Sequence, residues 1–459
     1  MPLYTRSGSL ESPLKDVARW HFQSSALLRL VPAWSGVEVL EIPSRLEDGA
    51  IVTLRVPVPP IGRKKWISRI ENVDHGISFV DDQVSGPFKR WRHEHMLSED
   101  DSGRCRLTDS LDFELPHPPP IRNIGERVVE RALVKTFSWR HRRTSQDVLR
   151  LRETDWIQRK ILLTGSSGLV GTSLRALLKV AGCDVVRLVR RNADPTLGEF
   201  QWDPAKGEID LRAFEGVDAV VNLSGAGIAD KRWTPERKKV LRDSRVDSTA
   251  LLARSIAGLS GEKPAFICAS ATGVYGDRPG ERCDEDSSPG NSFLSRTCVE
   301  WEAAAAPALQ AGARVAHLRI GVVVAYAGGA VSKLRRPVSL GLGGPVGNGR
   351  QGMSWIALDD LVGVIAHSIV DERYQGPINC VAPEGIDNRG FMKAMGRVMR
   401  RPVIAPLPAF AVKALFGQMG EEALLQGVFA EPRKLESLGF RFDFPELEDA
   451  LRFELGQLD

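Results

Sequence analysis

The sequence predicts an α/β protein: a doubly wound parallel sheet that follows a separate α+β domain. Two observations predict the sheet. Apolar runs of strand length alternate with helical patterns from Lys160 onward, and a glycine-rich turn follows the first run. A third observation predicts the α+β domain, because short segments of alternating apolar and polar residues fill the N-terminal third and end in one long helical pattern.

The glycine-rich turn lies between the apolar run 161–163 and a helix expected to start near Leu169. Its glycines recur at every third position. A tight strand-to-helix turn needs residues without a side chain, and a phosphate reaches backbone N–H groups only where no Cβ intervenes. The residues expected to bind a pyrophosphate are therefore Gly165, Ser166, Ser167, Gly168, Leu169, Val170 and Gly171.

The end of the second strand, expected over 183–189, indicates which dinucleotide is bound. A site for NAD usually carries an acidic residue about 20 positions after the glycines. This chain has Arg190 and Arg191 there instead. Two guanidinium groups suit a 2′-phosphate, which favours NADP(H) over NAD(H). The alternative is a solvated basic turn.

Two further strands are expected to end near the same ligand. The third, 217–222, is followed by small residues that let a ligand approach the sheet edge, where open α/β sheets bind their ligands. The fourth, 265–269, leads directly into Ser270. The residues after the third strand that we expect to contact the cofactor are Leu223, Ser224, Gly225 and Ala226.

The α+β domain combines alternating segments such as 52–56 and 111–115 with a helix after His117. Beyond this helix, the charged segment from Arg142 to Arg159 lacks an apolar stripe and is expected to link the domains. The apolar face of the helix is expected to comprise Ile121, Ile124, Val128, Ala132 and Phe137.

Composition excludes several classes of protein. The 459 residues suffice for two or three domains, and a net charge of +4 gives no reason to expect a polyanion partner such as nucleic acid. The six cysteines form no Cys-x-x-Cys motif, which indicates reduced thiols. Without a signal-peptide pattern or an apolar run of about 20 residues, we expect a soluble, cytoplasmic protein with no membrane span.

His93 and His95 would share one face of a strand, as a metal-binding pair would. Two imidazoles without a third type of ligand nearby are more often cavity-lining or solvated residues. No metal is therefore expected.

The N-terminal domain resembles the polyketide-cyclase or START-like superfamily over roughly residues 10 to 145. The resemblance rests on the order of its elements and on the short runs 20–22, 84–88 and 137–141. It implies a helix-grip fold, in which a sheet wraps around a long final helix and encloses a cavity for an apolar ligand.

Residues 160–455 resemble the atypical epimerase-like branch of the extended short-chain dehydrogenase/reductases, usually named as epimerases of nucleotide-diphosphate sugars. The runs that carry this resemblance are 163–171, 222–226 with 230–233 and 243–245, 318–321, and 341–344 with 349–350 and 354–356. The resemblance implies a Rossmann fold that binds NADP(H), adds Arg245 to the expected cofactor-binding residues, and places a substrate site between the sheet edge and the C-terminal region.

Together these observations divide the chain into four parts. The expected parts are a START-like helix-grip domain (1–145), a linker (146–159), the NADP-binding Rossmann domain (160–403) and a small C-terminal domain of the epimerase-like family (404–459).

The sequence departs from the wider superfamily at its catalytic pair. Those enzymes use Tyr-x-x-x-Lys at the start of a helix, where the lysine lowers the pKa of the tyrosine. Here Phe293 lies in the corresponding run 291–297, and no such pair is present. Ser270 is the expected hydroxyl donor to a substrate carbonyl, with Thr272 as its neighbouring alternative. Tyr275 or a bound water is the expected proton source.

Two classes of function remain. The first is an NADP(H)-dependent oxidoreductase or epimerase-like enzyme acting on a small hydroxy or keto substrate. The second is a non-catalytic NADP(H)-binding sensor or scaffold whose N-terminal domain holds an apolar ligand. The missing pair favours the sensor, but redox chemistry is the commoner use of such a site, so we prefer the enzyme.

Overall fold

The computed structural model describes residues 3–58 and 62–458, which form two compact units. Unit 1 comprises the described residues within Met1–Trp156, Ala176–Gly182 and Arg452–Asp459. Unit 2 comprises Ile157–Arg175 and Cys183–Leu451. No helix among the described residues is both long enough and apolar enough to cross a membrane.

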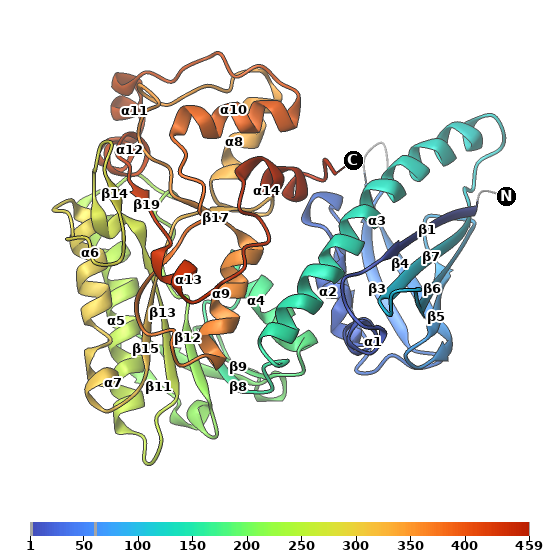
Figure 1. The fold of residues 1–459 in the computed structure, drawn as a ribbon, viewed down its shortest axis with the longest axis horizontal. Coiled ribbons are helices and arrows are strands. Elements are labelled where there is room, and N and C mark those ends of the chain that lie inside the picture. The colour runs from blue at the N-terminus through green and yellow to red at the C-terminus, as the bar shows by residue number, and fades with distance from the viewer. Residues whose placement is uncertain (1–2, 59–61, 459) are drawn as a thin grey trace. The chain divides into compact units, whose positions relative to one another are not determined.

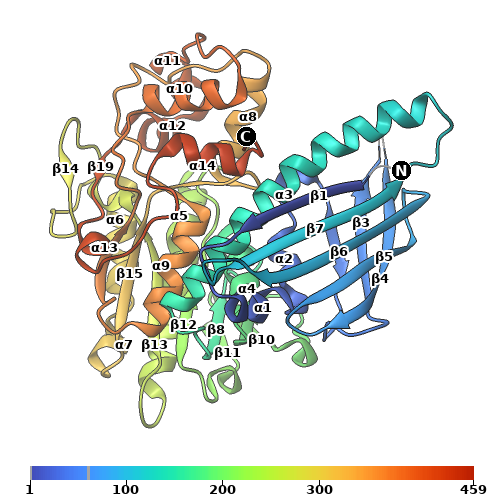
Figure 2. The same cartoon turned by 45° about the vertical axis from the view of Figure 1, so that its right-hand side comes forward.

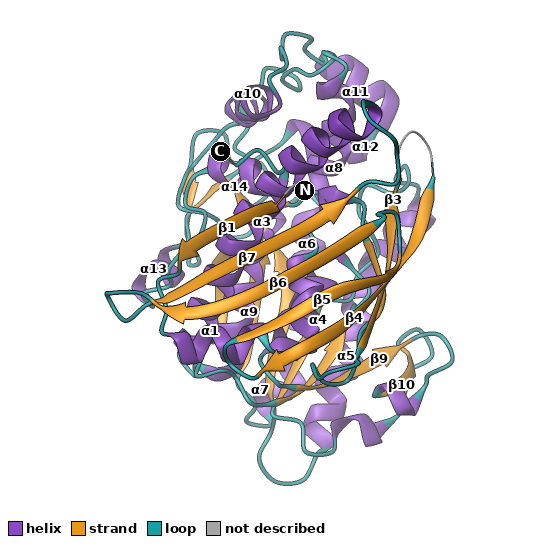
Figure 3. Ribbon diagram, turned by 90° about the vertical axis from the view of Figure 1, so that its right-hand side faces the viewer, coloured by secondary structure: helices purple, strands orange, loops and turns teal. Residues whose placement is uncertain are grey.

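Unit 1 is built on an antiparallel sheet of seven strands (Figure 3). In the order in which they pair, the strands are β1 (Leu3–Ser9), β7 (Cys105–Glu114), β6 (Arg90–Glu99), β5 (Ser78–Ser85), β4 (Arg63–Asp74), β3 (Ile51–Pro57) and β2 (Glu38–Glu41). Burial alternates along β6 and β7, as expected for strands with one face in the core. The alternating segments predicted from the sequence are therefore confirmed as strands.

The long helix α3 (Ile121–Glu153) packs against β1 and β7, as the ribbon in Figure 1 shows. Helices α1 (Leu14–His21) and α2 (Leu27–Leu30) also contact it. The expected apolar face of α3 is wrong over its first turns, since Ile121, Ile124 and Val128 are each more than 60% exposed. The core instead takes Val129 and Leu133, one position after Val128 and Ala132, while Phe137 is buried as expected.

The charged segment expected to be a linker forms the last part of α3 through Glu153. Charged side chains such as Arg143 and Asp147 are buried there together with Val148 and Leu151. Arg29 of α2 holds Asp147 in a two-point ion pair, with Nε–Oδ2 and Nη2–Oδ1 distances of 2.8 and 2.7 Å, and both side chains are only 5% exposed. The sequence showed no helical apolar pattern here because part of the buried face is ionic.

Unit 2 contains an eight-stranded sheet in the order β11 (Glu208–Ile209), β10 (Glu199–Asp203), β9 (Asp184–Val189), β8 (Lys160–Thr164), β12 (Ala219–Asn222), β13 (Ala265–Ala271), β15 (Val315–Ile320) and β18 (Gly376–Cys380). All neighbours are parallel except β11, which pairs antiparallel with β10. The chain winds outward from β8 through β9 and β10, and then in the other direction from β12. The order reverses between β8 and β12, which confirms the doubly wound fold and identifies its ligand-binding edge.

Helices α5 (Pro235–Gly258), α6 (Phe293–Ala303) and α7 (Ala306–Gln310) lie on one side of this sheet, and α9 (Leu358–Val370) lies on the other (Figures 1 and 2). Helix α4 (Leu169–Val180) follows the glycine turn. Thr234 caps α5, accepting a hydrogen bond from the N–H of Arg237 at 3.2 Å, as its residue type and the following proline favour. A cluster that includes Leu162, Val220 and Phe266 forms the core beneath α5 and α7.

The remaining elements of unit 2 follow β15 or are short additions. They are β14 (Arg282–Cys283), β16 (Val322–Val324), α8 (Gly329–Ser339), β17 (Trp355–Ala357), α10 (Asn388–Met399), α11 (Ala409–Phe416), α12 (Gln418–Gly420), β19 (Phe429–Ala430), α13 (Arg433–Ser437) and the first part of α14 (Leu447–Glu454), whose residues from Arg452 onward belong to unit 1. The parallel pairs β14–β19 and β16–β17 attach segments far apart in sequence to one another.

Arg29→Met should destabilise the protein by about 3–5 kcal/mol, because it leaves the buried carboxylate of Asp147 without its two-point partner. Urea unfolding measures the loss, and hydrogen exchange should locate it in α2 and α3. The matched control is Arg55→Ala, which breaks a half-exposed pair with Glu38 and should cost at most about 1 kcal/mol. Equal losses in the two variants would contradict a structural role for the buried pair.

Candidate functional site

The glycine turn passes very close to the end of β12. Gly165 has a φ of +66°, and a Cβ there would lie 2.6 Å from the carbonyl oxygen of Leu223. A Cβ on Gly171 would lie 2.2 Å from the carbonyl oxygen of Gly165. The turn exposes Ser167 and Gly168, and the first N–H groups of α4 have no partner within the helix. This geometry is a cradle for an anionic group at the switch point of the sheet.

A chain of buried polar groups, which sequence reasoning missed, fixes the two strand ends. Thr164 donates its hydroxyl to Asn222 Oδ1 at 2.7 Å, and Asn222 Nδ2 donates to Thr249 Oγ1 at 2.8 Å. Asn222 Oδ1 also accepts the N–H of Ser224 at 3.1 Å. Asn222 therefore connects β8, β12 and α5. The signal in the sequence was an amide at the end of an otherwise apolar strand.

The loop after β12 lies beside Arg245, as expected for residues of one site. A Cβ on Gly225 would lie 3.3 Å from the Arg245 guanidinium carbon. Arg245 stacks over the ring of Trp301 at 5.2 Å and donates to the carbonyl of Leu241 at 2.8 Å. Burial lowers the pKa of Arg245. Its partners fix the guanidinium against the backbone of the loop 223–226.

The two arginines after β9 differ in their surroundings. Both are exposed. Arg191 lies 2.5 Å from Glu199 Oε1, and Arg187 approaches the same oxygen at 2.8 Å. The side chain of Glu199 is completely buried. Arg190 is therefore the arginine that can turn to a new anion without giving up a contact with Glu199.

Ser270 is buried at the end of β13 rather than open to a ligand. It is 3% exposed, and its hydroxyl donates to Glu302 Oε1 at 2.7 Å. Arg319 pairs with the same carboxylate through Nε and Nη2, each at 3.0 Å. Thr272, two positions later, is half-buried. Of the two hydroxyls that the sequence singled out, only that of Thr272 belongs to a residue with appreciable exposure.

Tyr275 is fully buried and belongs to the same polar chain. Its hydroxyl donates to Asn379 Oδ1 at 2.6 Å and accepts from Arg319 Nη1 at 3.0 Å. Burial raises the pKa of Tyr275 to about 12, although Arg319 acts in the opposite direction. The phenol is therefore neutral at ordinary pH.

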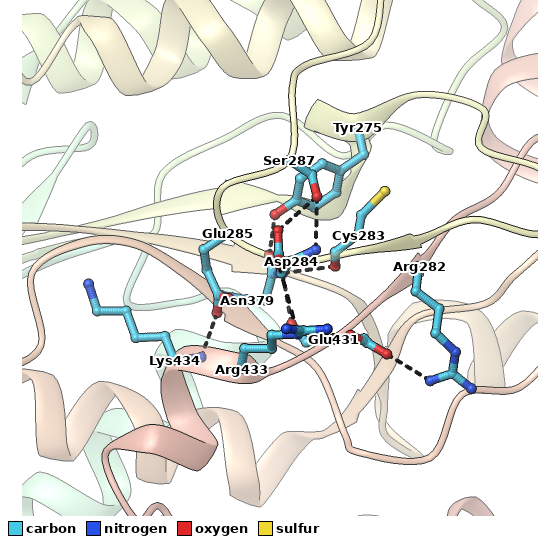
Figure 4. Close-up of polar contacts among 10 residues, drawn as sticks. All are labelled: Tyr275, Arg282, Cys283, Asp284, Glu285, Ser287, Asn379, Glu431, Arg433 and Lys434. Atoms are coloured by element: carbon cyan, nitrogen blue, oxygen red, sulfur yellow. Dashed lines mark hydrogen bonds and ion pairs between the residues drawn. The ribbon is translucent and has the colours of Figure 1, made fainter.

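The close-up in Figure 4 shows what surrounds the partner of Tyr275. The side-chain amide of Asn379 donates to the carbonyl of Glu431 at 2.9 Å, while its backbone N–H donates to Glu285 Oε1 at 3.0 Å. The same Glu285 oxygen accepts the N–H of Lys434 at 3.2 Å. These contacts join β18 to α13 and to the segment after β14. Tyr275 is thus part of a hydrogen-bond network that holds these three segments together.

The start of α6 holds an apolar side chain where the superfamily pair would begin. Phe293 packs edge-on against Trp233, with ring centroids 5.3 Å apart. Glu422 accepts the N–H groups of Phe293 and Leu294 at 3.3 and 3.0 Å, which caps the helix.

Unit 1 holds a cavity of about 210 Å³ between its sheet and α3. Apolar side chains such as Val52, Leu54 and Leu133 form most of its wall. The START-like resemblance stays a prediction, but a cavity of the kind that it implies is present.

Three known families match separate parts of the chain. Residues 161–379 match the NAD dependent epimerase/dehydratase family. Residues 407–454 match a domain of unknown function (DUF1731), and residues 41–148 match another (DUF8410).

Individual relatives extend the comparison. An epimerase family protein of Mycobacterium bovis is 42% identical over 293 residues, which are 64% of this chain and 96% of that protein. The crystal structure of a nucleoside-diphosphate sugar epimerase from Corynebacterium glutamicum is 30% identical, with a TM-score of 0.80 over 99% of this chain and 90% of that one. The structure of human epimerase family protein SDR39U1 with NADPH is 32% identical, with a TM-score of 0.59 over 65% of this chain and all of that one.

Gly171→Ala should destabilise unit 2 by about 1–3 kcal/mol, because the new methyl group would meet the backbone of Gly165. The sign of the stability change is informative, because alanine is otherwise more favourable than glycine in a helix by up to about 1 kcal/mol. Gly258→Ala is the control: it lies at the exposed end of α5 with open space around it. Thermal unfolding should show a lower Tm for Gly171→Ala and no loss for Gly258→Ala. A stabilised Gly171→Ala variant would contradict the close approach.

Proposed function

The chain belongs to the NAD dependent epimerase/dehydratase family, and on that premise we propose that it is an NADP(H)-dependent oxidoreductase or epimerase-like enzyme acting on a small hydroxy or keto substrate. The observation that carries this proposal is the cradle at the switch point. There a Cβ at Gly165 or Gly171 would collide with neighbouring backbone, so only glycine permits the tight turn whose N–H groups can receive a pyrophosphate. The bound dinucleotide would supply or accept a hydride.

Two observations support NADP(H) over NAD(H). Arg190 and Arg191 follow β9, at the position where a ribose 2′-phosphate is recognised in this fold. The human relative SDR39U1, 32% identical, has been solved with NADPH. Arg190 is proposed as the main phosphate contact because Arg191 is paired with Glu199.

The remaining tasks are hydrogen bonding to the substrate, positioning of the strand end and proton transfer. Thr272, half-buried just beyond β13, is proposed to donate a hydrogen bond to the substrate oxygen. A hydroxyl suits this role because it stabilises a developing oxyanion without ionising. Ser270 and Tyr275 are proposed to hold the strand end in place through Glu302 and Arg319. A phenol with a pKa near 12 is a poor proton acceptor at neutral pH, so a bound water is the proposed proton carrier.

The second candidate is a non-catalytic NADP(H)-binding sensor or scaffold. It is favoured by Phe293 in place of the catalytic tyrosine and by the apolar cavity of unit 1, which would hold a ligand. Turnover distinguishes the two: an enzyme consumes NADPH with a substrate, whereas a sensor binds NADPH without consuming it.

Arg190→Ala should weaken NADPH binding by about 1.5–3 kcal/mol, or roughly 10–100-fold, because a charge-assisted hydrogen bond to the 2′-phosphate is lost. NADH binding should change little. Calorimetric titration of both cofactors measures the difference, and Arg212→Ala, an exposed arginine distant in sequence, is the control. Equal weakening for both cofactors would contradict selection through the 2′-phosphate.

The catalytic proposal is tested by a turnover screen and two alanine variants. NADPH consumption would be followed by absorbance across sugar nucleotides, quinones and aldehydes. On any substrate found, Thr272→Ala should lower kcat by about 10²-fold or more, with NADPH affinity unchanged. Ser270→Ala should mainly lower Tm, because its partner Glu302 has a side chain only 16% exposed and would lose a hydrogen bond.

The opposite pattern, a kcat loss in Ser270→Ala alone, would return the catalytic role to Ser270. No turnover on any compound class, together with intact NADPH binding, would favour the sensor.

A further inference from the structure

One wall of the cavity in unit 1 carries a cluster of ionisable side chains that the proposed function does not use. They come from four different elements, and each is at least nine-tenths buried. The members of this histidine–aspartate cluster are His21 at the end of α1, His93 and His95 on β6, Asp109 on β7 and His141 on α3.

The histidines converge on the carboxylate of Asp109. Its Oδ1 lies 2.9 Å from His93 Nε2 and 3.1 Å from His95 Nδ1, and its Oδ2 lies 2.7 Å from His141 Nε2. His21 Nε2 lies 3.2 Å from His95 Nδ1. The ligand atoms of His93, His95 and Asp109 all lie within 4.8 Å of one another.

Protons alone cannot satisfy this arrangement. If His95 Nδ1 carries a proton, it donates to Asp109, and His21 Nε2 must then be an acceptor. The proton of His21 would then be on Nδ1, which is buried and has no hydrogen-bond partner among the described residues. If His95 Nδ1 carries no proton, it accepts from His21, but its lone pair then faces the carboxylate of Asp109. Each choice leaves an unsatisfied or repulsive buried contact.

The side chains themselves are of the type that binds metal ions. Neutral imidazole nitrogens and a carboxylate are the forms that coordinate a metal, and here they converge at a site where each side chain is at least nine-tenths buried.

We propose that the histidine–aspartate cluster binds a divalent first-row transition-metal ion, with His93 Nε2, His95 Nδ1 and Asp109 as ligands and His21 Nε2 as the fourth. A cation among these atoms resolves the conflict at His95, because the lone pairs of both imidazoles and the carboxylate then face the ion. His141 is a positioning residue that donates to the other carboxylate oxygen. Imidazole ligands favour Zn²⁺ or Fe²⁺ over Mg²⁺ and Ca²⁺.

The ion would face the cavity. His21, His93 and His95 line the cavity, whereas Asp109 and His141 stand behind them. Apolar side chains such as Val56 and Phe79 form most of the remaining wall, which also holds Asp81 and Arg140. The site therefore suits a largely apolar molecule that carries one oxygen donor to the metal, such as a carboxylate or hydroxyl.

The first test measures metal content of the untagged full-length protein. After removal of metals with a chelator and dialysis, the protein would be titrated separately with Zn²⁺, Co²⁺, Mg²⁺ and, without oxygen, Fe²⁺. We expect one transition-metal ion per chain by elemental analysis, a rise in Tm with Zn²⁺ but not with Mg²⁺, and the visible absorption of Co²⁺ in a nitrogen–oxygen site of low coordination number. Uptake of no ion, or equal stabilisation by Mg²⁺, would overturn the proposal.

The second test locates the ion. His95→Asn and Asp109→Asn each remove a ligand and should weaken Co²⁺ binding by about 10²-fold or more, while His141→Gln should weaken it by about 10–100-fold. His75→Asn and His117→Asn are matched controls, because these histidines are exposed in the same unit, and they should bind as the wild type does. Circular dichroism would verify that each variant is folded. If His95→Asn misfolds, the Co²⁺ spectrum of His141→Gln decides: a spectrum and affinity identical to the wild type would overturn the site.

Discussion

The contact between the glycine turn and the end of β12 is the constraint on which the ligand-binding edge of unit 2 depends. Gly165 and Leu223 approach so closely that only a residue without a side chain fits. Asn222 sets this distance by hydrogen bonding to Thr164 on one strand and to Thr249 on the covering helix. The cradle is therefore rigid before any ligand arrives, so binding need not include the cost of ordering it.

Features that depend on local residue type could be predicted from the sequence. The glycine turn, the Thr234 cap and several strands of each sheet are recognised from residue types and short periods, and these are present. Features that depend on contacts distant in sequence could not. The face of α3 was misjudged by one position, because Ile121 and Val128 suggested a stripe that the core does not use. The expected linker was helical because Asp147 pairs with Arg29, 118 residues away.

The same difference between local features and contacts distant in sequence applies to the candidate sites. Sequence reasoning could expect an anion-binding turn and small residues after β12, since these follow from position in a βαβ unit, and their binding of a dinucleotide stays a prediction. It could not distinguish Ser270 from Thr272, because which hydroxyl is covered depends on Glu302 from the next helix. It also gave little weight to His93 and His95 as a metal pair, because Asp109 and His21 join them only through the fold.

The complete burial of Glu199 has a consequence for cofactor preference. Its single carboxylate pairs with both Arg187 and Arg191, so it offsets one of their two positive charges before a phosphate binds. A phosphate that recruits Arg191 must share that guanidinium with Glu199 or displace it. The selectivity contributed by Arg191 is thus the difference between two ion pairs, smaller than the value of its pair with the phosphate. A Glu199→Gln chain would hold both arginines less tightly and leave more positive charge for a phosphate.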